Sequence, residues 1–372
     1  QITATDVDSS ATDDDTNDIT LTSTGGGIQA ISIVAGAQND VTLDAQGGAI
    51  TDDGAAAVDV TADVLTADAA GGIDLDTTVA SLNATTSVVG DIVIDETDAI
   101  DLTDVDTNDG TITVTAGGQI TATDVSTAST DDGTNTITLT STGAGIQAIS
   151  IDAGTQNDAV LDAQGGSITQ DNAGAVDVTA DVLTADAAGG IDLDTEVATL
   201  DASTSAAGDI VIDEVSDIVL LDVDTADGAI TVDAVGQITA TDVDSSATDD
   251  NTNDITLTST GAGIEAGSIV AGSANDVTLD AQGGSISQDG DAGADVVADV
   301  LTADAAGGID LDTTIATLDA STSALGEIVI DETDAIDLLD VDTADGAITV
   351  TAGGQITATD VDSSATDDDT ND

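Results

Sequence analysis

Short runs of alternating apolar and polar residues recur along the whole chain, with Ile, Val or Leu at every second position. Such alternation predicts half-buried β-strands, with the aliphatic side chains inside and Thr and Asp outside. Gly-Gly, Asn-Asp and Asp-Gly pairs lie between the runs, where turns need them. Residues 63–70 are the one helix-like stretch, and it is short. In the first 118 residues the runs are Asp18–Thr22, Asp40–Asp44, Val58–Val60, Gly72–Asp76, Asp91–Asp95 and Thr111–Thr115.

A longer repeat contains these runs. The string QITATDV begins at Gln1, Gln119, Gln237 and Gln355, always 118 residues apart. The sequence therefore predicts three copies, 1–118, 119–236 and 237–354, and the start of a fourth at 355–372, with five or six strand-bearing sub-repeats in each copy. No linker separates the copies, so we expect one continuous array that is an internal part of a longer protein.

The sub-repeats are too short to enclose a core of their own, so we expect them to stack as the coils of a parallel β-solenoid. Coils about 4.8 Å apart have a narrow interior, which ladders of Val, Ile, Leu and Ala can fill without any aromatic residue. The absence of Pro fits strands that donate their N–H groups to neighbouring coils. The alternative is a row of immunoglobulin-like sandwiches, since such a domain takes about 100 residues. Sandwich cores usually contain Trp or Tyr, and this chain has neither.

Charge narrows the possible partners. The chain has 75 acidic residues and no Lys, Arg or His, which gives a net charge of −75. Nothing in it can neutralise a phosphate, which excludes nucleic acid, and anionic membrane surfaces are repelled. No apolar run approaches the ~18 residues of a membrane helix. Repulsion at this charge density favours a cation-rich medium outside the cell.

Three phrases carry a resemblance to a known family: GGIDLDT (Gly71–Thr77), GDIVIDE (Gly90–Glu96) and DGTITVTAGGQITA (Asp109–Ala122). They resemble the filamentous-haemagglutinin-type repeats of giant secreted bacterial adhesins. The resemblance implies a parallel β-helix, secretion across a Gram-negative envelope and a role at the cell surface. This chain departs from typical members because it lacks basic and aromatic residues. The departure favours a stalk or filament shaft over direct adhesive binding.

One acidic motif resembles a calcium loop. Alternate carboxylates precede a glycine turn in each copy, and hard oxygen ligands of this kind suit Ca²⁺. The spacing differs from that of an EF-hand loop, and the simpler interpretation is a solvated acidic turn. We nevertheless predict calcium here, because no basic side chain offsets the charge. The predicted ligands are Asp104, Asp106, Asp109, Asp222, Asp224, Asp227, Asp340, Asp342 and Asp345.

Two further groups of acids have simpler interpretations. Neighbouring acids occur as Asp95-Glu96, Asp213-Glu214 and Asp331-Glu332, but adjacent strand residues point to opposite faces and cannot converge as a catalytic pair. With no His, Lys, Cys or Tyr to assist them, we expect no enzymatic activity. The other group is expected to form a hydrated corner loop. It comprises Asp6, Asp8, Asp13, Asp14, Asp15 and Asp18, with Asp124, Asp131, Asp132 and Gly133 as its thinner counterpart.

These observations predict a non-enzymatic structural segment, the stiff polyanionic shaft of an extracellular fibre, stalk or surface filament. Its expected partners are the chain itself, through stacked repeats and lateral fibre packing, and cations. The alternatives are an adhesin binding module and a cation-sequestering matrix or sheath protein.

Overall fold

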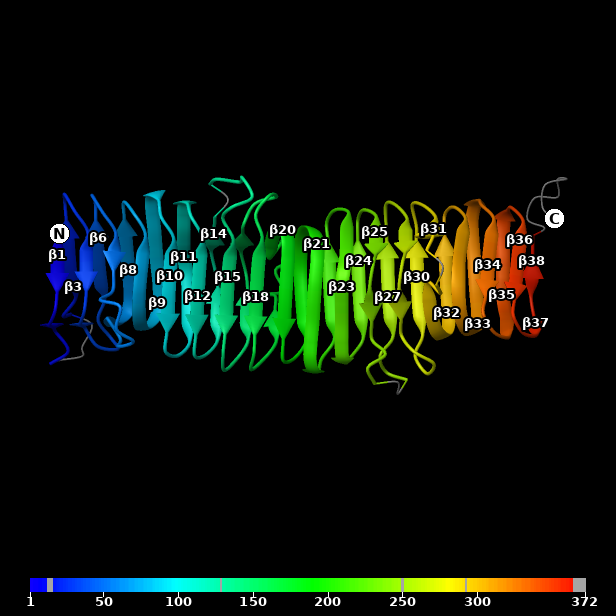
Figure 1. Cartoon of the computed structure of the whole chain (residues 1–372), viewed down its shortest axis with the longest axis horizontal. Helices are drawn as coiled ribbons and strands as arrows, with labels where there is room; N and C mark the ends of the chain where they lie inside the picture. The colour runs from blue at the N-terminus through cyan, green and yellow to red at the C-terminus, as the bar shows by residue number, and fades with distance from the viewer. Residues whose placement is uncertain (12–15, 128, 249–250, 292, 364–372) are drawn as a thin grey trace. The chain divides into compact units, whose positions relative to one another are not determined.

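The computed structural model describes residues 1–11, 16–127, 129–248, 251–291 and 293–363. These residues form β-strands, turns and loops and contain no helix, so none of them forms a helix that could cross a membrane. The chain divides into two units, Gln1–Ala188 and Gly189–Asp372. Within each unit the strands of successive turns lie side by side and pair in parallel (Figure 1). The prediction of an all-β parallel solenoid is confirmed.

Each turn contributes one to three strands, most of them short. In the first unit they are β1 (Ile2–Ala4), β2 (Val7–Asp8), β3 (Ile19–Ser23), β4 (Ile28–Ala30), β5 (Ile33–Val34), β6 (Val41–Ala45), β7 (Ile50–Thr51), β8 (Val60–Ala69), β9 (Ile73–Val89), β10 (Ile92–Glu96), β11 (Ile100–Asp109), β12 (Ile112–Ala116), β13 (Ile120–Ala122), β14 (Val125–Ser126), β15 (Ile137–Ser141), β16 (Ile146–Ala148), β17 (Ile151–Asp152), β18 (Ala159–Ala163), β19 (Ile168–Thr169) and β20 (Val178–Ala187). In the second unit they are β21 (Ile191–Ala207), β22 (Ile210–Glu214), β23 (Ile218–Asp227), β24 (Ile230–Ala234), β25 (Ile238–Ala240), β26 (Val243–Asp244), β27 (Ile255–Ser259), β28 (Ile264–Ala266), β29 (Ile269–Val270), β30 (Val277–Ala281), β31 (Ile286–Gln288), β32 (Val296–Ala305), β33 (Ile309–Leu325), β34 (Ile328–Glu332), β35 (Ile336–Asp345), β36 (Ile348–Ala352), β37 (Ile356–Ala358) and β38 (Val361–Asp362).

Like side chains stack on like side chains inside the first unit. One ladder of direct partners has isoleucine at seven successive positions before it continues with Ala159, and nearly all of these isoleucines are fully buried. Stacked β-branched residues suit strands, and their contacts exclude water along the axis of the unit. The ladder runs through Ile2, Ile28, Ile50, Ile73, Ile92, Ile112 and Ile137.

A second ladder in the same unit begins at Ile19. It passes through Val41, Leu65, Leu82, Leu102, Ala122 and Ala148. Ile137 is the counterpart of Ile19 in the next 118-residue copy, yet it belongs to the ladder of Ile2. Corresponding residues of the first two copies therefore lie in different ladders.

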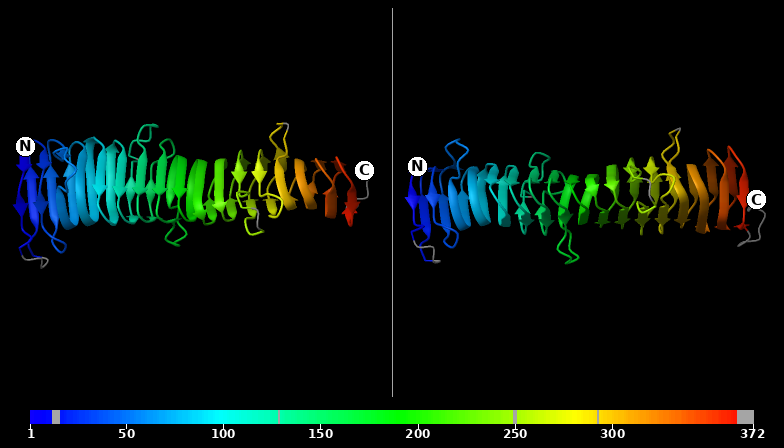
Figure 2. Two further views of the ribbon diagram at one scale, coloured as in Figure 1. Left: turned by 60° about the horizontal axis from the view of Figure 1, so that its bottom comes forward. Right: turned by 90° about the horizontal axis from the view of Figure 1, so that it is seen from below.

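Turn length varies although register is kept. Ile2 pairs with Ile28, a turn of 26 residues, whereas Leu65 pairs with Leu82, a turn of only 17. The longer turns carry loops that project from the stacked strands (Figure 2). Loops of unequal length are tolerated because they leave the inward-facing positions of the strands in register.

The sandwich alternative is wrong for the described residues, because their strand pairings are parallel, whereas sandwich sheets are antiparallel. The helix-like stretch 63–70 lies almost entirely in strand β8. Five of the six predicted runs start one residue before a strand, and Val58–Val60 starts two residues before β8. The short strands between the runs, such as β4 and β5, were not predicted.

Glycine is required where successive turns come closest at a corner. Gly72, Gly90 and Gly110 stack on one another, and a Cβ added to Gly90 would collide with the backbone nitrogen of Gly72. A Cβ added to Gly110 would collide in the same way with the carbonyl oxygen of Gly90. The glycine pairs that were interpreted as turn signals therefore also permit close stacking.

Candidate functional site

The predicted calcium ligands lie on β11 and its counterparts β23 and β35. Asp104 and Asp106 are partly buried, and Asn83 donates a hydrogen bond to Asp104 Oδ2 at 3.3 Å. Partial burial, followed by the charge of Asp104, raises the pKa of Asp106 to about 6. Asp109 Oδ1 accepts a hydrogen bond from Asn135 at 3.4 Å. These three described aspartates do not bring their oxygens within 4.8 Å of one another.

In the second and third copies the counterparts of this pair are exposed: Asp222, Asp224, Asp340 and Asp342. Desolvation and then Asp222 raise the pKa of Asp224 to about 6, and desolvation and then Asp340 raise that of Asp342. Asp227 Oδ1 accepts a hydrogen bond from the hydroxyl of Thr248 at 3.0 Å. Each copy therefore places two carboxylates side by side near the expected ligand position, and calcium binding at these residues stays a prediction.

A different triad of carboxylates meets in the first unit. Asp52, Asp59 and Asp76 each offer an oxygen, and the three oxygens lie within 4.8 Å of one another. Asp59 is only 2% exposed, and its Oδ2 accepts the backbone N–H of Asp76 at 3.0 Å. Burial raises the pKa of Asp59 to about 6, with Asp52 and Asp76 adding to the rise. Three converging carboxylates are chemically suited to a hard divalent cation.

Sequence reasoning missed this triad because its members come from two turns. Only their register brings Asp76 next to Asp59, and the spacing of 52, 59 and 76 matches no metal motif. In the other copies Gln170 and Gln288 replace Asp52, while the buried aspartate persists as Asp177 and Asp295. The buried carboxylate is thus a feature of every copy, and the third acid belongs to the first copy alone.

The neighbouring acids point to opposite sides, as predicted. Asp95 is exposed, whereas Glu96 is only 5% exposed. Glu96 Oε2 accepts hydrogen bonds from Val79 N and Thr77 Oγ1, and Oε1 accepts one from Asp98 N at 3.2 Å. Glu214 and Glu332 make the same set of bonds in their copies. These bonds give the buried glutamates a structural role.

Aspartates also stack in direct register on the outer surface. Asp194, Asp213 and Asp233 are partners in three successive turns, and Asp76 pairs with Asp95 in the first unit. Partial burial and then Asp194 and Asp233 raise the pKa of Asp213. Parallel strands lie about 4.8 Å apart, so each carboxylate has a like charge as its nearest neighbour.

The acidic corner loop is held by a buried asparagine of the next turn. Asn39 Oδ1 accepts hydrogen bonds from Thr16 N and Asn17 N, and Asn39 Nδ2 donates to Ala35 O at 2.9 Å. Asn157 does the same for Gly133, Thr134 and Asn135 of the second copy. Asp13, Asp14 and Asp15 lie outside the described residues.

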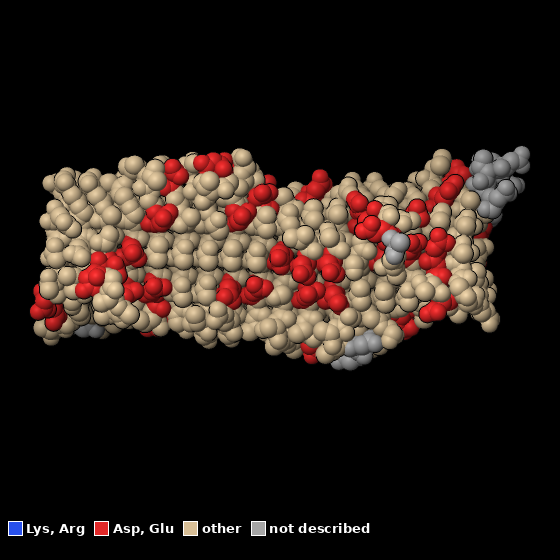
Figure 3. Space-filling model, in the orientation of Figure 1, with Lys and Arg blue, Asp and Glu red and all other residues tan. Residues whose placement is uncertain are grey.

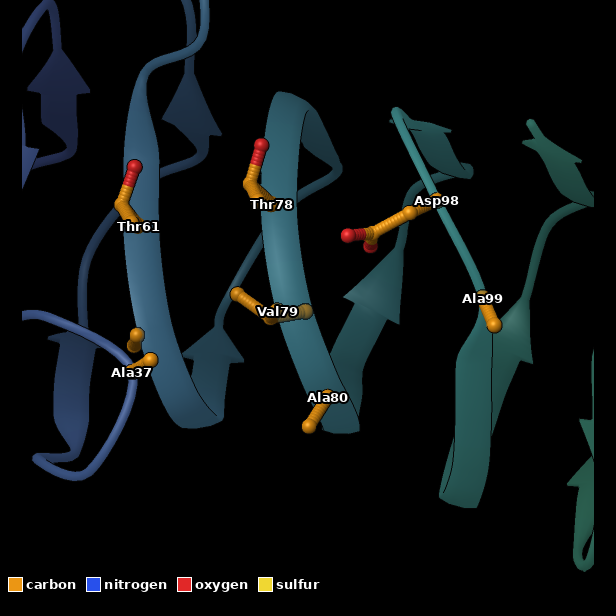
Figure 4. A pocket seen from close by; sticks show the side chains of 8 residues that line it. Ala37, Thr61, Thr78, Val79, Ala80, Asp98 and Ala99 are labelled. Carbon is orange, nitrogen blue, oxygen red and sulfur yellow. The ribbon is translucent and has the colours of Figure 1, made fainter. Parts of the chain in front are cut away.

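A shallow groove of about 310 Å³ crosses four turns of the first unit (Figure 4). Its floor is apolar and formed by Ala62 and Val79, and Asp98 lies at one end. A groove of about 260 Å³ occupies the corresponding place in the second unit, with Ala298 and Ile315 in the floor. Corresponding residues of the first and third copies therefore build the two grooves.

The surface carries charge of one sign only. Acidic side chains form clusters separated by uncharged surface on the face seen in Figure 3, and no basic side chain accompanies them. Comparison of the chain with family models, curated proteins and solved structures yields no match in any of the three.

Proposed function

We propose that this chain is the structural shaft of an extracellular fibre, stalk or surface filament, a segment of a giant bacterial repeat protein. The observation that carries the proposal is the isoleucine ladder from Ile2 to Ile137. Six successive parallel strand pairings, each between one turn and the next, connect these two residues. A ladder of this kind resists bending because each turn is bonded to the next along its strands. We place the protein outside the cell, at a Gram-negative surface, for two reasons. Its repeats resemble those of secreted bacterial adhesins, and its 75 carboxylates need a medium rich in cations.

The finer architecture is part of this proposal. We propose that one 118-residue copy makes five and a half turns, so that its successor is rotated by half a turn. Support comes from Ile137, which stacks in the ladder of Ile2 and not in that of Ile19. Within the first unit, the second copy would then present its loops on the side opposite to those of the first.

Electron microscopy of two lengths tests the shaft. Residues 1–354 fused to residues 1–372 continue the repeat without a seam, because Gln355 begins the same string as Gln1. Negatively stained particles of the fusion are expected to be about twice as long as those of the single chain and equally wide. A string of compact beads, or particles that thicken instead of lengthening, would contradict a shaft.

The second candidate function is cation sequestration, and the triad of Asp52, Asp59 and Asp76 favours it. We propose calcium at this triad and retain the proposal for Asp104, Asp106, Asp109 and their counterparts. Calcium should raise the melting temperature after chelation at low salt, and calorimetry should count the sites. Asp59→Asn should remove one site, and a double Asp104→Asn and Asp106→Asn variant another. Unchanged melting across chelator, calcium and a tenfold salt range would reject specific binding and leave the shaft proposal intact.

A further inference from the structure

The groove of each unit is built from corresponding residues. Ala62, Val79 and Asp98 of the first unit correspond to Ala298, Ile315 and Asp334 of the second, each 236 residues further along. The groove crosses a short turn in each unit: Leu65 pairs with Leu82 and Leu301 with Leu318, turns of 17 residues. The floor residues themselves are buried, whereas Ala80 and Ala316 at the edge of the floor are exposed.

A buried carboxylate lies below each floor. Glu96 accepts the N–H of Val79, and Glu332 accepts that of Ile315, both at 3.0 Å. Both glutamates are 5% exposed. Their partners are hydroxyl and N–H groups, because the chain has no basic side chain. The apolar floor therefore lies over a negative charge that no cation of the chain balances, and low polarity strengthens such a field.

In the second unit a carboxylate lies at each end of the groove, since Asp299 and Asp334 both line it. Val300 pairs with Thr317, and Thr317 with Asp337, so these two aspartates belong to turns two steps apart. Two steps of ~4.8 Å separate the turns by about 10 Å. In the first unit Asp98 lies at the corresponding end and is the one carboxylate among the described residues that line the groove.

We propose that the groove of the second unit binds a linear aliphatic diammonium ligand. A methylene chain matches a floor of Ala298 and Ile315, and the chain has no aromatic ring to cage a quaternary ammonium. The terminal ammonium groups reach carboxylates two turns apart in the second unit. Primary amines of this kind are protonated at neutral pH, with pKa values near that of lysine, about 10.4.

Alkyl diamines of two lengths test this proposal by titration calorimetry on the whole chain at about 0.15 M salt, where distant charges are screened. The probes are 1,8-diaminooctane, whose length approaches the separation of the turns, and the shorter 1,4-diaminobutane. We expect one saturable site for the longer diamine, in the second unit, and only weak, salt-sensitive association for the shorter. Equal affinity for both would mean unspecific counterion binding and would overturn the proposal.

Matched variants locate the site. A double Asp98→Asn and Asp334→Asn variant should weaken binding of the longer diamine about tenfold or more, the usual effect of losing a charge-assisted hydrogen bond. Ala80→Leu with Ala316→Leu fills both grooves from exposed positions and should abolish binding while leaving thermal melting unchanged. Asp101→Asn with Asp337→Asn removes the same charge outside the grooves and should leave affinity unaltered. If this control weakens binding as much as the groove variants, the groove is not the site.

A basic protein segment offers the same alkylammonium group through its lysine side chains, and a lysine-rich peptide distinguishes that source. Binding of the peptide that competes with the diamine, and is lost with Ala80→Leu and Ala316→Leu, would identify a protein partner and overturn the small-molecule proposal. None of these outcomes depends on the shaft proposal, which electron microscopy tests separately.

Discussion

The carboxylate of Glu96 accepts the backbone N–H of Val79 at 3.0 Å, so a side chain takes the place of a main-chain carbonyl in the interior of the first unit. The same oxygen accepts the hydroxyl of Thr77 at 2.9 Å. Burial raises the pKa of Glu96, while its hydrogen bonds oppose the rise. Glu96 thus joins its own turn to the turn before it, which contains Thr77 and Val79. The 17-residue turn from Leu65 to Leu82 lies at the same place.

Replacing Glu96 by alanine should destabilise the first unit, because the buried N–H of Val79 loses its acceptor. An unpaired buried donor costs about 1–3 kcal/mol. Glu96→Gln should cost less, since its amide oxygen can still accept the N–H. Hydrogen exchange at the Val79 amide measures the effect locally, which suits a repeat protein whose turns can open separately. Asp95→Asn, at the exposed neighbour, should leave this exchange unchanged, and equal acceleration by both variants would contradict the assigned role.

Part of this structure was predictable from the pattern of residues. Alternation from Ile92 and Ile94 places residue 96 inside, yet an acidic residue was expected to lie outside, as surface position is the rule for Glu. The hydrogen bonds that satisfy it come from another turn, which the local sequence does not show. The triad of Asp52, Asp59 and Asp76 was unpredictable for a similar reason. Asp76 comes next to Asp59 only because Val60 pairs with Thr77, and the local sequence does not show how many residues separate two paired strands. Strand type and stacking, by contrast, follow from a period of two maintained over the chain.

Glycine at position 90 should be irreplaceable even by alanine. A Cβ there would collide with the backbone of Gly71 and Gly72, which cannot move without shifting a paired strand. Overpacking of this kind typically costs about 1–3 kcal/mol or more. Gly25→Ala is the matched control, because a Cβ at Gly25 meets no atom within 4 Å. Thermal melting should fall for Gly90→Ala and change little for Gly25→Ala; a similar change in both would show that backbone entropy, not contact, decides.

Stability should rise as the pH falls from 7 to 5. The pKa values of Asp59, Asp106, Asp224 and Asp295 are raised to about 6 in the folded chain, from an ordinary value of 3.8, chiefly by burial. The folded state therefore binds protons more tightly than the unfolded state. The stabilisation appears as the pH falls through about 6, is complete below about 3.8, and is lost as the pH rises through 6.

Melting temperature measured between pH 7 and 5 in constant salt checks this expectation, and the rise should be at least about 3 °C. Asp8, whose pKa is lowered by hydrogen bonds from Ser10, does not affect the trend, because it is ionised in both the folded and the unfolded chain between pH 7 and 5. Asp59→Asn should reduce the rise, because it removes one of the four groups. A melting temperature that falls steadily over the same range would mean that these carboxyls are not raised.

Thr3 and Thr138 should lie on one face of the first unit, although Thr138 corresponds in the repeat to Thr20. Pairing carries Thr3 to Thr138 in six steps, which at ~4.8 Å each gives about 29 Å. Thr20 lies beside Ile19 on the other ladder. If a copy makes five and a half turns, Thr20 and Thr138 lie on opposite sides of the coil, so the distance between them includes the width of the coil as well as the axial separation.

The chain has no cysteine, so paired Cys substitutions can carry spin labels without background. Pulsed electron resonance should give a shorter distance for Thr3→Cys with Thr138→Cys than for Thr20→Cys with Thr138→Cys, while Thr3→Cys with Thr113→Cys calibrates five steps. If each copy made a whole number of turns, the order of the first two distances would be reversed, and the alternation of faces would be rejected.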